Sequence, residues 1–251
     1  MIPTRSRLTS VAVAFALCAL PTAARAVTAT SELVYNFTYS SNQSITARDS
    51  VNNVEPILVG SGGTSGMSHY GGTLTEKGTL TVDFVKRQPD GAVVVTISEQ
   101  GLNIRRAPPA ECVVYGNTHV ICDPNKTVYT EEYTLLRFMG ANFVDPSQLD
   151  SSKHWQIVQN GGDGEDVSAD YTINGSSSGT MQIGEERKIK DDGAGHLTTN
   201  IETKIRYDSA RLIPISVDEY ATQHADSGIK GTSTTTYQTT LDLASGTVAK
   251  P

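Results

Sequence analysis

Alternation of apolar and polar side chains with a period of two constrains this chain more than any other feature. Successive side chains of a strand point to opposite faces, so such a run predicts a strand with one buried face. The longest run places an apolar residue or threonine at every second position, namely Leu197, Thr199, Ile201, Thr203, Ile205 and Tyr207. Shorter runs occupy residues 33–39, 80–84, 93–98, 155–158, 171–173, 181–183, 212–217 and 230–243.

Turn-forming residues separate several of these runs. Gln88–Gly91 combines a proline, which fixes φ, with a glycine, which accepts positive φ, so residues 80–98 are expected to form a hairpin. Asn174–Gly179 and Asp191–Gly195 are expected to be loops. Pro214 lacks a backbone N–H, which predicts that its strand is bulged or lies at an edge.

One segment, Thr130–Gly140, has helical signals instead. Thr130 is expected to cap it, two glutamates follow in the first turn, and Gly140 can end it. Tyr133, Leu136 and Met139 recur at helical spacing. We expect these three side chains to pack on the apolar face of the sheet, formed by residues such as Leu80, Val82, Val93 and Val95.

These patterns predict a mainly β protein. The expected fold is a single antiparallel, strongly curved sheet, or an open barrel or sandwich, with one short helix. As an architecture, a curved antiparallel sheet with a small helix resembles the folds of bacterial periplasmic lipid carriers. Fold alone does not establish function, and no set of residues here matches a family closely enough to transfer one.

The first 26 residues have the layout of a secretory signal peptide. Arg5 and Arg7 form a basic region, an apolar run follows, and Ala24–Ala26 is a small-x-small cleavage signal. The apolar run is too short to span a bilayer comfortably. We therefore expect cleavage after Ala26, leaving 27–251 as a single β-rich domain that is secreted or periplasmic.

Charge and hydropathy limit the partners of the exported domain. Cleavage would remove Arg5, Arg7 and Arg25 but no acidic residue, so the formal charge would change from −7 to about −10. A charge of this sign opposes binding to nucleic acid. No later segment is long and apolar enough to predict a stable membrane span after cleavage.

Cys112 and Cys122 are expected to form a disulfide. No C-x-x-C pair or local cluster of ligands indicates zinc or redox chemistry, and disulfides persist in exported proteins. If Gly116–Thr118 is a three-residue loop between two strands, Cys112 lies directly opposite Cys122. A two-residue loop would shift the register and place the cysteines on opposite faces.

Other motifs do not predict a catalytic, metal or cofactor site. Gly175–Gly179 matches G-x-S-x-G around Ser177, but a strand rather than a helix is expected to follow the serines. The histidines lack metal-ligand spacing, and the acidic segments Asp163–Asp166 and Asp191–Asp192 do not follow a calcium-loop pattern.

The preferred hypothesis is a non-catalytic β-protein that binds an apolar small molecule or lipid, or a protein partner. The alternatives are a structural or surface-interaction protein with a fully packed sheet, and a hydrolase of unrecognised type. A ligand is expected beside the helix, because a short helix next to glycine and proline can move. The residues expected to line that site are Tyr133, Leu136, Met139, Phe143 and Trp155.

Overall fold

The computed structural model describes residues 32–48, 67–101, 106–115, 118–139, 153–160, 165–191, 196–226 and 231–246. The strands are β1 Glu32–Arg48, β2 Met67–Arg87, β3 Val93–Gly101, β4 Arg106–Val114, β5 Val120–Cys122, β6 His154–Asn160, β7 Glu165–Ser177, β8 Thr180–Asp191, β9 Leu197–Asp208, β10 Ile213–Asp226 and β11 Gly231–Gly246. One helix of the described residues, α1 Thr130–Arg137, lies between β5 and β6 in the chain.

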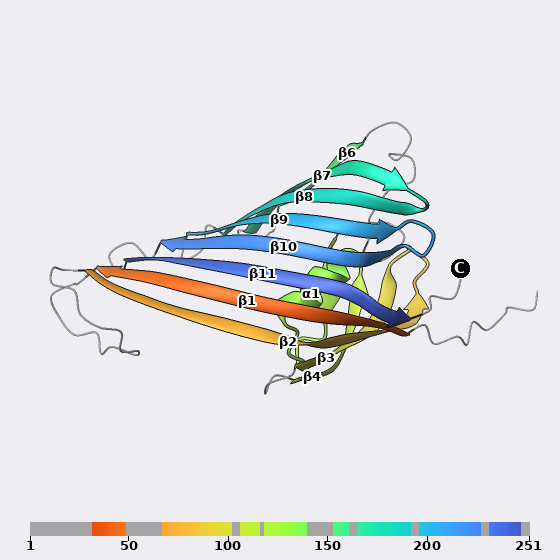
Figure 1. Ribbon diagram of the computed structural model, residues 1–251, viewed down its shortest axis with the longest axis horizontal. Helices are drawn as coiled ribbons and strands as arrows, with labels where there is room; N and C mark the ends of the chain where they lie inside the picture. Colours follow the sequence, from red (N-terminus) through yellow and green to blue (C-terminus); the bar gives the residue numbers. More distant parts are fainter. Residues whose placement is uncertain are drawn as a thin grey trace, which may run out of the picture.

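The eleven strands form one antiparallel sheet in the order β5-β4-β3-β2-β1-β11-β10-β9-β8-β7-β6. Neighbours in the sheet are also consecutive in the chain, except where β1 pairs with β11 at the centre. The sheet bends around α1 but does not close into a barrel, so β5 and β6 remain its two ends (Figure 1). The predicted mainly β fold with a single curved sheet and one short helix is confirmed.

Burial follows the alternation expected from the sequence. In β9, Ile201, Thr203, Ile205 and Tyr207 are buried, whereas the intervening Glu202, Lys204 and Arg206 are exposed. The same alternation on the other strands gives the sheet an inner apolar face, against which the buried side chains of α1 pack. The hydrophobic core therefore lies between the inner face of the sheet and the helix.

Of the turns that follow β2 and β7, the first matches the prediction and the second is shorter than expected. Gln88–Gly91 forms the predicted turn between β2 and β3, with Gly91 at a φ of 88°. Between β7 and β8, by contrast, the turn is only Ser178 and Gly179, because Gly175–Ser177 pair with β8 after an irregularity at Asn174. Small polar residues in that segment stay in the strand since cross-strand pairing satisfies their backbone groups.

Pro214 lies in β10, which is a central strand rather than an edge. The register of β10 with β9 shifts between Pro214 and Ser216, so the strand is bulged there. Of the two predicted alternatives, a bulged strand or an edge strand, the first is observed. The carbonyl oxygen of Pro214 accepts a hydrogen bond of 2.8 Å from the buried hydroxyl of Tyr35 in β1. This contact satisfies a carbonyl group near the irregularity.

The N-cap residue of α1 lies one position earlier in the chain than expected. Tyr129, not Thr130, is the N-cap residue, because the Glu132 carboxylate accepts a 2.7 Å hydrogen bond from the Tyr129 backbone N–H. Glu131 and Glu132 occupy the first turn as predicted. The predicted terminator, Gly140, lies outside the described residues.

The helix contacts strands from both halves of the sheet, namely β3 and β5 on one side and β10 and β11 on the other. Leu135, Leu136, Phe138 and Met139 are at most 1% exposed and belong to the core. Complete burial of one such side chain contributes about 1.5–3 kcal/mol. The prediction that Tyr133 also packs inward was wrong: Tyr133 is 40% exposed, and the polar Thr134 and Arg137 contact the sheet through Glu219 and Glu185.

Among the described residues, α1 is the only helix, and it is too short to cross a membrane.

Candidate functional site

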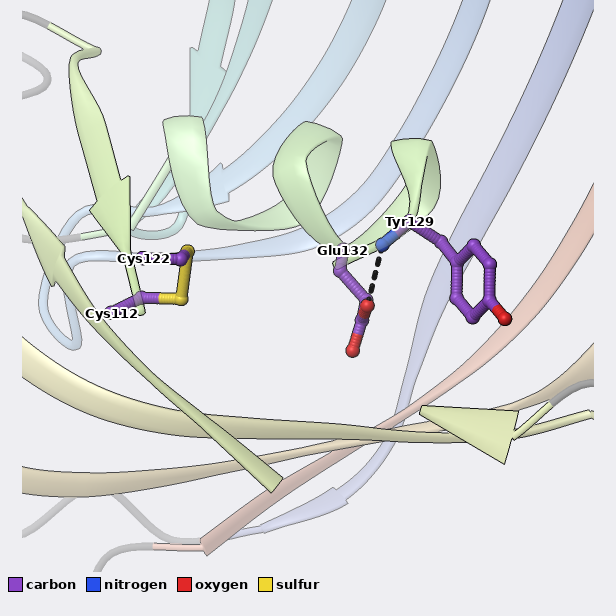
Figure 2. The surroundings of a disulfide bond; sticks show 4 residues. All are labelled: Cys112, Cys122, Tyr129 and Glu132. Carbon is purple, nitrogen blue, oxygen red and sulfur yellow. Dashed lines mark hydrogen bonds between the residues drawn. A yellow bond between two sulfur atoms is a disulfide. The ribbon is translucent and has the colours of Figure 1, made fainter. Parts of the chain in front are cut away.

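The predicted disulfide joins β4 and β5, the strands at one end of the sheet. Cys112 of β4 pairs in register with Cys122 of β5, their Cα atoms are 4.0 Å apart, and their sulfurs are bonded. Tyr115 N–H donates to the His119 carbonyl at 2.9 Å, as a three-residue loop requires. Figure 2 shows this disulfide close to α1, whose first turn carries the Tyr129–Glu132 hydrogen bond. The disulfide therefore links β4 covalently to β5, the end strand of the sheet that contacts α1.

On the other side of α1, Arg137 enters the inner face of the sheet. Its Nη1 lies 2.9 Å from Glu185 Oε1 on β8, and its Nη2 pairs with Glu219 Oε2 on β10. All three side chains are almost completely buried. A guanidinium that spans two buried carboxylates fixes the position of the helix on the sheet, since charge-assisted hydrogen bonds are strong and directional.

Hydroxyl groups complete the coordination of the two carboxylates. Glu185 accepts hydrogen bonds from Tyr171 at 2.8 Å and from Thr203 at 2.7 Å. Glu219 accepts one from Thr134 of the helix at 2.9 Å. Each of the four carboxylate oxygens thus has at least one donor, which offsets the cost of removing the charges from water.

The electrostatics follow from this burial. Burial raises the pKa of Glu219, and the nearby Arg137 guanidinium opposes that rise. For Arg137, burial disfavours the cation, but Glu185 and Glu219 outweigh it and raise the pKa above its ordinary value. Burial and the neighbouring Glu185 likewise raise the pKa of Tyr171, so its hydroxyl remains a donor.

A second guanidinium, that of Arg187, lies next to this network with far fewer partners. Arg187 Nη1 donates to Thr118 Oγ1 at 3.3 Å and lies 3.9 Å from Glu185 Oε1. Its Nε is buried without a hydrogen-bond partner, and the side chain is 11% exposed. Burial, and then the repulsion from Arg137, lower the pKa of Arg187.

A cavity of about 490 Å³ opens between α1, the β4–β5 hairpin and the inner face of the sheet. Its walls combine apolar and polar side chains, which are Thr118, His119, Val120, Thr130, Tyr133, Thr134, Arg137, Gln159, Arg187, Ile189, Ile201 and Glu219. A concave site with a mainly hydrophobic surface and a few fixed polar groups is the usual form of a small-molecule site. This cavity is the candidate site, and we name it the helix cavity.

A larger groove of about 590 Å³ is a weaker candidate for a ligand site. It is lined mostly by side chains of the opposite, outer face of the sheet, including Asp170, Glu186, Glu202 and Asp218. His154 Nε2 lies 3.2 Å from Asp170 Oδ1 there, but both side chains are substantially exposed. Solvated polar groups on an open face do not define a ligand site, so volume alone does not favour this groove.

The residues expected to line a ligand site are distributed differently. Tyr133 lies in the wall of the helix cavity. Leu136 and Met139 belong to the core, as does Trp155, which stacks on Tyr171 with ring centroids 5.0 Å apart. Phe143 lies outside the described residues. Of the residues expected to line a ligand site, Tyr133 alone is among the described lining residues of the helix cavity, and the ligand site beside the helix stays a prediction.

The ionic residues of the site were missed, although the sequence carried a signal for them. Glu185 and Arg187 follow Ile183 on the inner face of β8, and Glu219 follows Val217 on β10. Charged residues at positions where the alternation requires apolar ones are costly unless paired. Such interruptions, on two strands and one helix, mark a buried polar cluster.

The G-x-S-x-G motif and the acidic segments do not form a recognisable catalytic or metal site among the described residues. Ser177 is exposed at the end of β7, and the strand β8 begins at Thr180, so the nucleophile elbow required of G-x-S-x-G is absent there. Within the described ranges, no group of three or more His, Cys, Asp or Glu side chains could hold a metal ion. Asp163 and Asp192, from the two acidic segments, lie outside those ranges.

Comparison with known proteins adds no assignment: no family model matches the chain, and no curated protein matches it either.

Proposed function

We propose that this protein is an exported, non-catalytic binding protein that holds an apolar or amphipathic small molecule in the helix cavity. The observation that carries the proposal is the cavity itself, which lies between the only described helix and the inner face of the sheet. Val120, Tyr133, Ile189 and Ile201 supply apolar surface to its walls. Contact with such surface favours the transfer of an apolar group from water.

Export is supported by two independent features. The Cys112–Cys122 disulfide would be reduced in most cytosolic environments and persists outside them. The pattern of residues 1–26 matches a secretory signal peptide. The proposed binding protein therefore acts in the periplasm or outside the cell.

A non-catalytic role agrees with the chemistry of the residues in and beside the cavity wall. The two buried carboxylates, Glu185 and Glu219, are the strongest candidates for acid or base chemistry, but they are held by Arg137 and by hydroxyl donors. These contacts occupy the oxygens that would otherwise accept a proton from a substrate. They suit a structural clamp on α1 better than a proton-transfer group.

The test is a titration with the neutral fluorescent dye Nile red. The variant Ile189→Trp places a larger side chain in the cavity wall, whereas Val158→Trp makes an apolar change on the outer face of β6, where Val158 is 60% exposed. We expect the wild type and Val158→Trp to bind the dye alike and Ile189→Trp to bind about tenfold more weakly, which corresponds to about 1.4 kcal/mol.

Thermal denaturation of each variant shows whether the fold is retained. Equal dye affinity in folded Ile189→Trp and wild type, or no dye binding by the wild type, would count against the cavity as a ligand site. The fully packed structural protein would then be the better description.

A further inference from the structure

Arg187 is a largely buried cation, and the described residues use little of its hydrogen-bonding capacity. A guanidinium has five N–H donors. Among the described residues, Arg187 makes one long hydrogen bond, to Thr118, and its buried Nε has no partner. Buried charged groups normally have hydrogen-bonded partners of opposite charge, because desolvation is otherwise costly.

The neighbouring carboxylates do not meet this requirement. Glu185 and Glu219 both pair closely with Arg137, whereas the nearest contact of Arg187 to a carboxylate is 3.9 Å, to Glu185. Tyr171, Thr203 and Thr134 also donate to these carboxylates. Every oxygen of Glu185 and Glu219 therefore has a hydrogen-bond donor without Arg187.

The mismatch beside the cavity is one of hydrogen bonds, because Arg137 and Arg187 together balance the charges of Glu185 and Glu219. Arg137 and Arg187 both line the helix cavity, and Glu219 is the one carboxylate among its described lining residues. Since Arg137 makes the close contacts to both carboxylates, the unused donors beside the cavity are those of Arg187. The side chains next to it in the wall include the apolar Ile189 and Ile201.

We propose that Arg187 binds the anionic head group, a carboxylate or a phosphate, of an amphipathic ligand whose apolar part lies against Ile189, Ile201 and Val120. This inference rests on the proposed function and specifies the chemical class of its ligand. A guanidinium suits either anion because its donors can bind two oxygens at once. Burial lowers the pKa of Arg187, and an anion bound beside the guanidinium would oppose that effect.

The test compares three probes with the same twelve-carbon chain: dodecanoate, dodecyl phosphate and dodecan-1-ol. Each displaces Nile red from the wild type, from Arg187→Met and from Arg206→Met, at concentrations below micelle formation. Arg206 is exposed on the outer face of β9, so its replacement removes the same charge away from the cavity. Arg187→Met keeps an unbranched apolar side chain in place of the guanidinium.

We expect the wild type and Arg206→Met to bind at least one anionic probe about tenfold or more tightly than the alcohol. The tighter of the two anions identifies the head group. In Arg187→Met, binding of the alcohol should persist and the preference for the anion should disappear. Arg187→Met should also remain folded, because it removes a buried charge that lacks a close partner.

Two results would overturn the inference while leaving the proposed function intact. One is equal affinity of the wild type for the alcohol and both anions, and the other is an undiminished preference for the anion in Arg187→Met. If none of the three probes and no dye binds, both the inference and the proposed function fail. If Arg187→Met does not fold, Arg187→Gln is measured instead, with the same expected loss of preference.

Discussion

Arg137 of α1 and Glu219 of β10 form a buried ion pair between residues that are 82 positions apart in the sequence. The same guanidinium pairs with Glu185 of β8, so one helical side chain connects two strands of the sheet. Because α1 also contacts β3 and β5 on its other side, this pair helps to hold the curved sheet around the helix. Both residues of the pair line the helix cavity.

Removal of the guanidinium should therefore destabilise the protein strongly. Arg137→Met leaves Glu185 and Glu219 buried close to each other without a cation between them, and breaking a buried pair from one side costs about 3–5 kcal/mol. Urea denaturation measures the change. Arg206→Met, on the exposed face of β9, should change the free energy of unfolding by less than about 0.5 kcal/mol. Equal stability of the two variants would contradict the role assigned to the network.

Leu136→Asp should disrupt the contact between helix and sheet. Leu136 is completely buried in the core, so the substitution introduces an unpaired charge there and removes an apolar contact. We expect a loss of about 3–5 kcal/mol, or increased dye binding at sites outside the cavity. Tyr133→Asp, three residues earlier on the 40% exposed side, serves as the control and should melt close to the wild type. An unchanged melting temperature of Leu136→Asp would show that the helix does not support the sheet.

The disulfide should be formed quantitatively in the exported protein. Alkylation of the folded protein without a reductant, followed by intact-mass measurement, should add no label to Cys112 or Cys122. Because the closed loop is short, reduction should lower the free energy of unfolding by only about 2–3 kcal/mol. Labelling of both cysteines in protein recovered outside the cell would contradict both the bond and part of the support for export.

Asp208 predicts a pH dependence of stability at the β9–β10 turn. Partial burial raises the pKa of this carboxyl, but hydrogen bonds from the Arg211 side chain and from the backbone N–H groups of Arg211 and Ala210 outweigh it, so the net pKa is lowered. A lowered pKa in the folded state stabilises the fold above the unfolded value of about 3.9. That contribution is lost as the pH falls through the folded-state pKa.

The measurement compares the urea midpoints of the wild type and Asp208→Asn at several pH values. We expect Asp208→Asn to be less stable at about pH 7, and the difference should shrink below about pH 4, where the aspartate itself becomes protonated. A difference that stays constant down to about pH 2.5 would show that the charge of Asp208 is not what stabilises the turn.

The fold was more predictable than the site, for a physical reason. Alternation is a local property, so the segment Leu197–Tyr207 indicated its strand and its buried face, and the spacing of Cys112 and Cys122 indicated their register. The pairing of β1 with β11, by contrast, joins the two ends of the described chain, as in Leu33 with Gly246, and no local pattern specifies it.

The site depends on contacts between α1 and strands that are 48 and 82 positions away in the sequence. Glu185 and Thr203 lie opposite each other, and so do Thr203 and Glu219, which brings three strands into one polar row. Arg137 contacts this row and Tyr133 is 40% exposed, whereas helical spacing alone had placed Tyr133 inward. Local periodicity predicted a helix on a sheet, but the orientation of the helix depends on charges supplied by distant strands.

Native mass spectrometry of the protein purified from its own source, without detergent, tests most directly whether the helix cavity holds a ligand. We expect the wild type to carry an additional mass that dissociates on denaturation and proves to be an amphipathic anion, and Arg187→Met, purified in the same way, to lack it. Bare mass for the folded wild type, or an identical additional mass on the folded variant Ile189→Trp, whose cavity is obstructed, would contradict the proposed site.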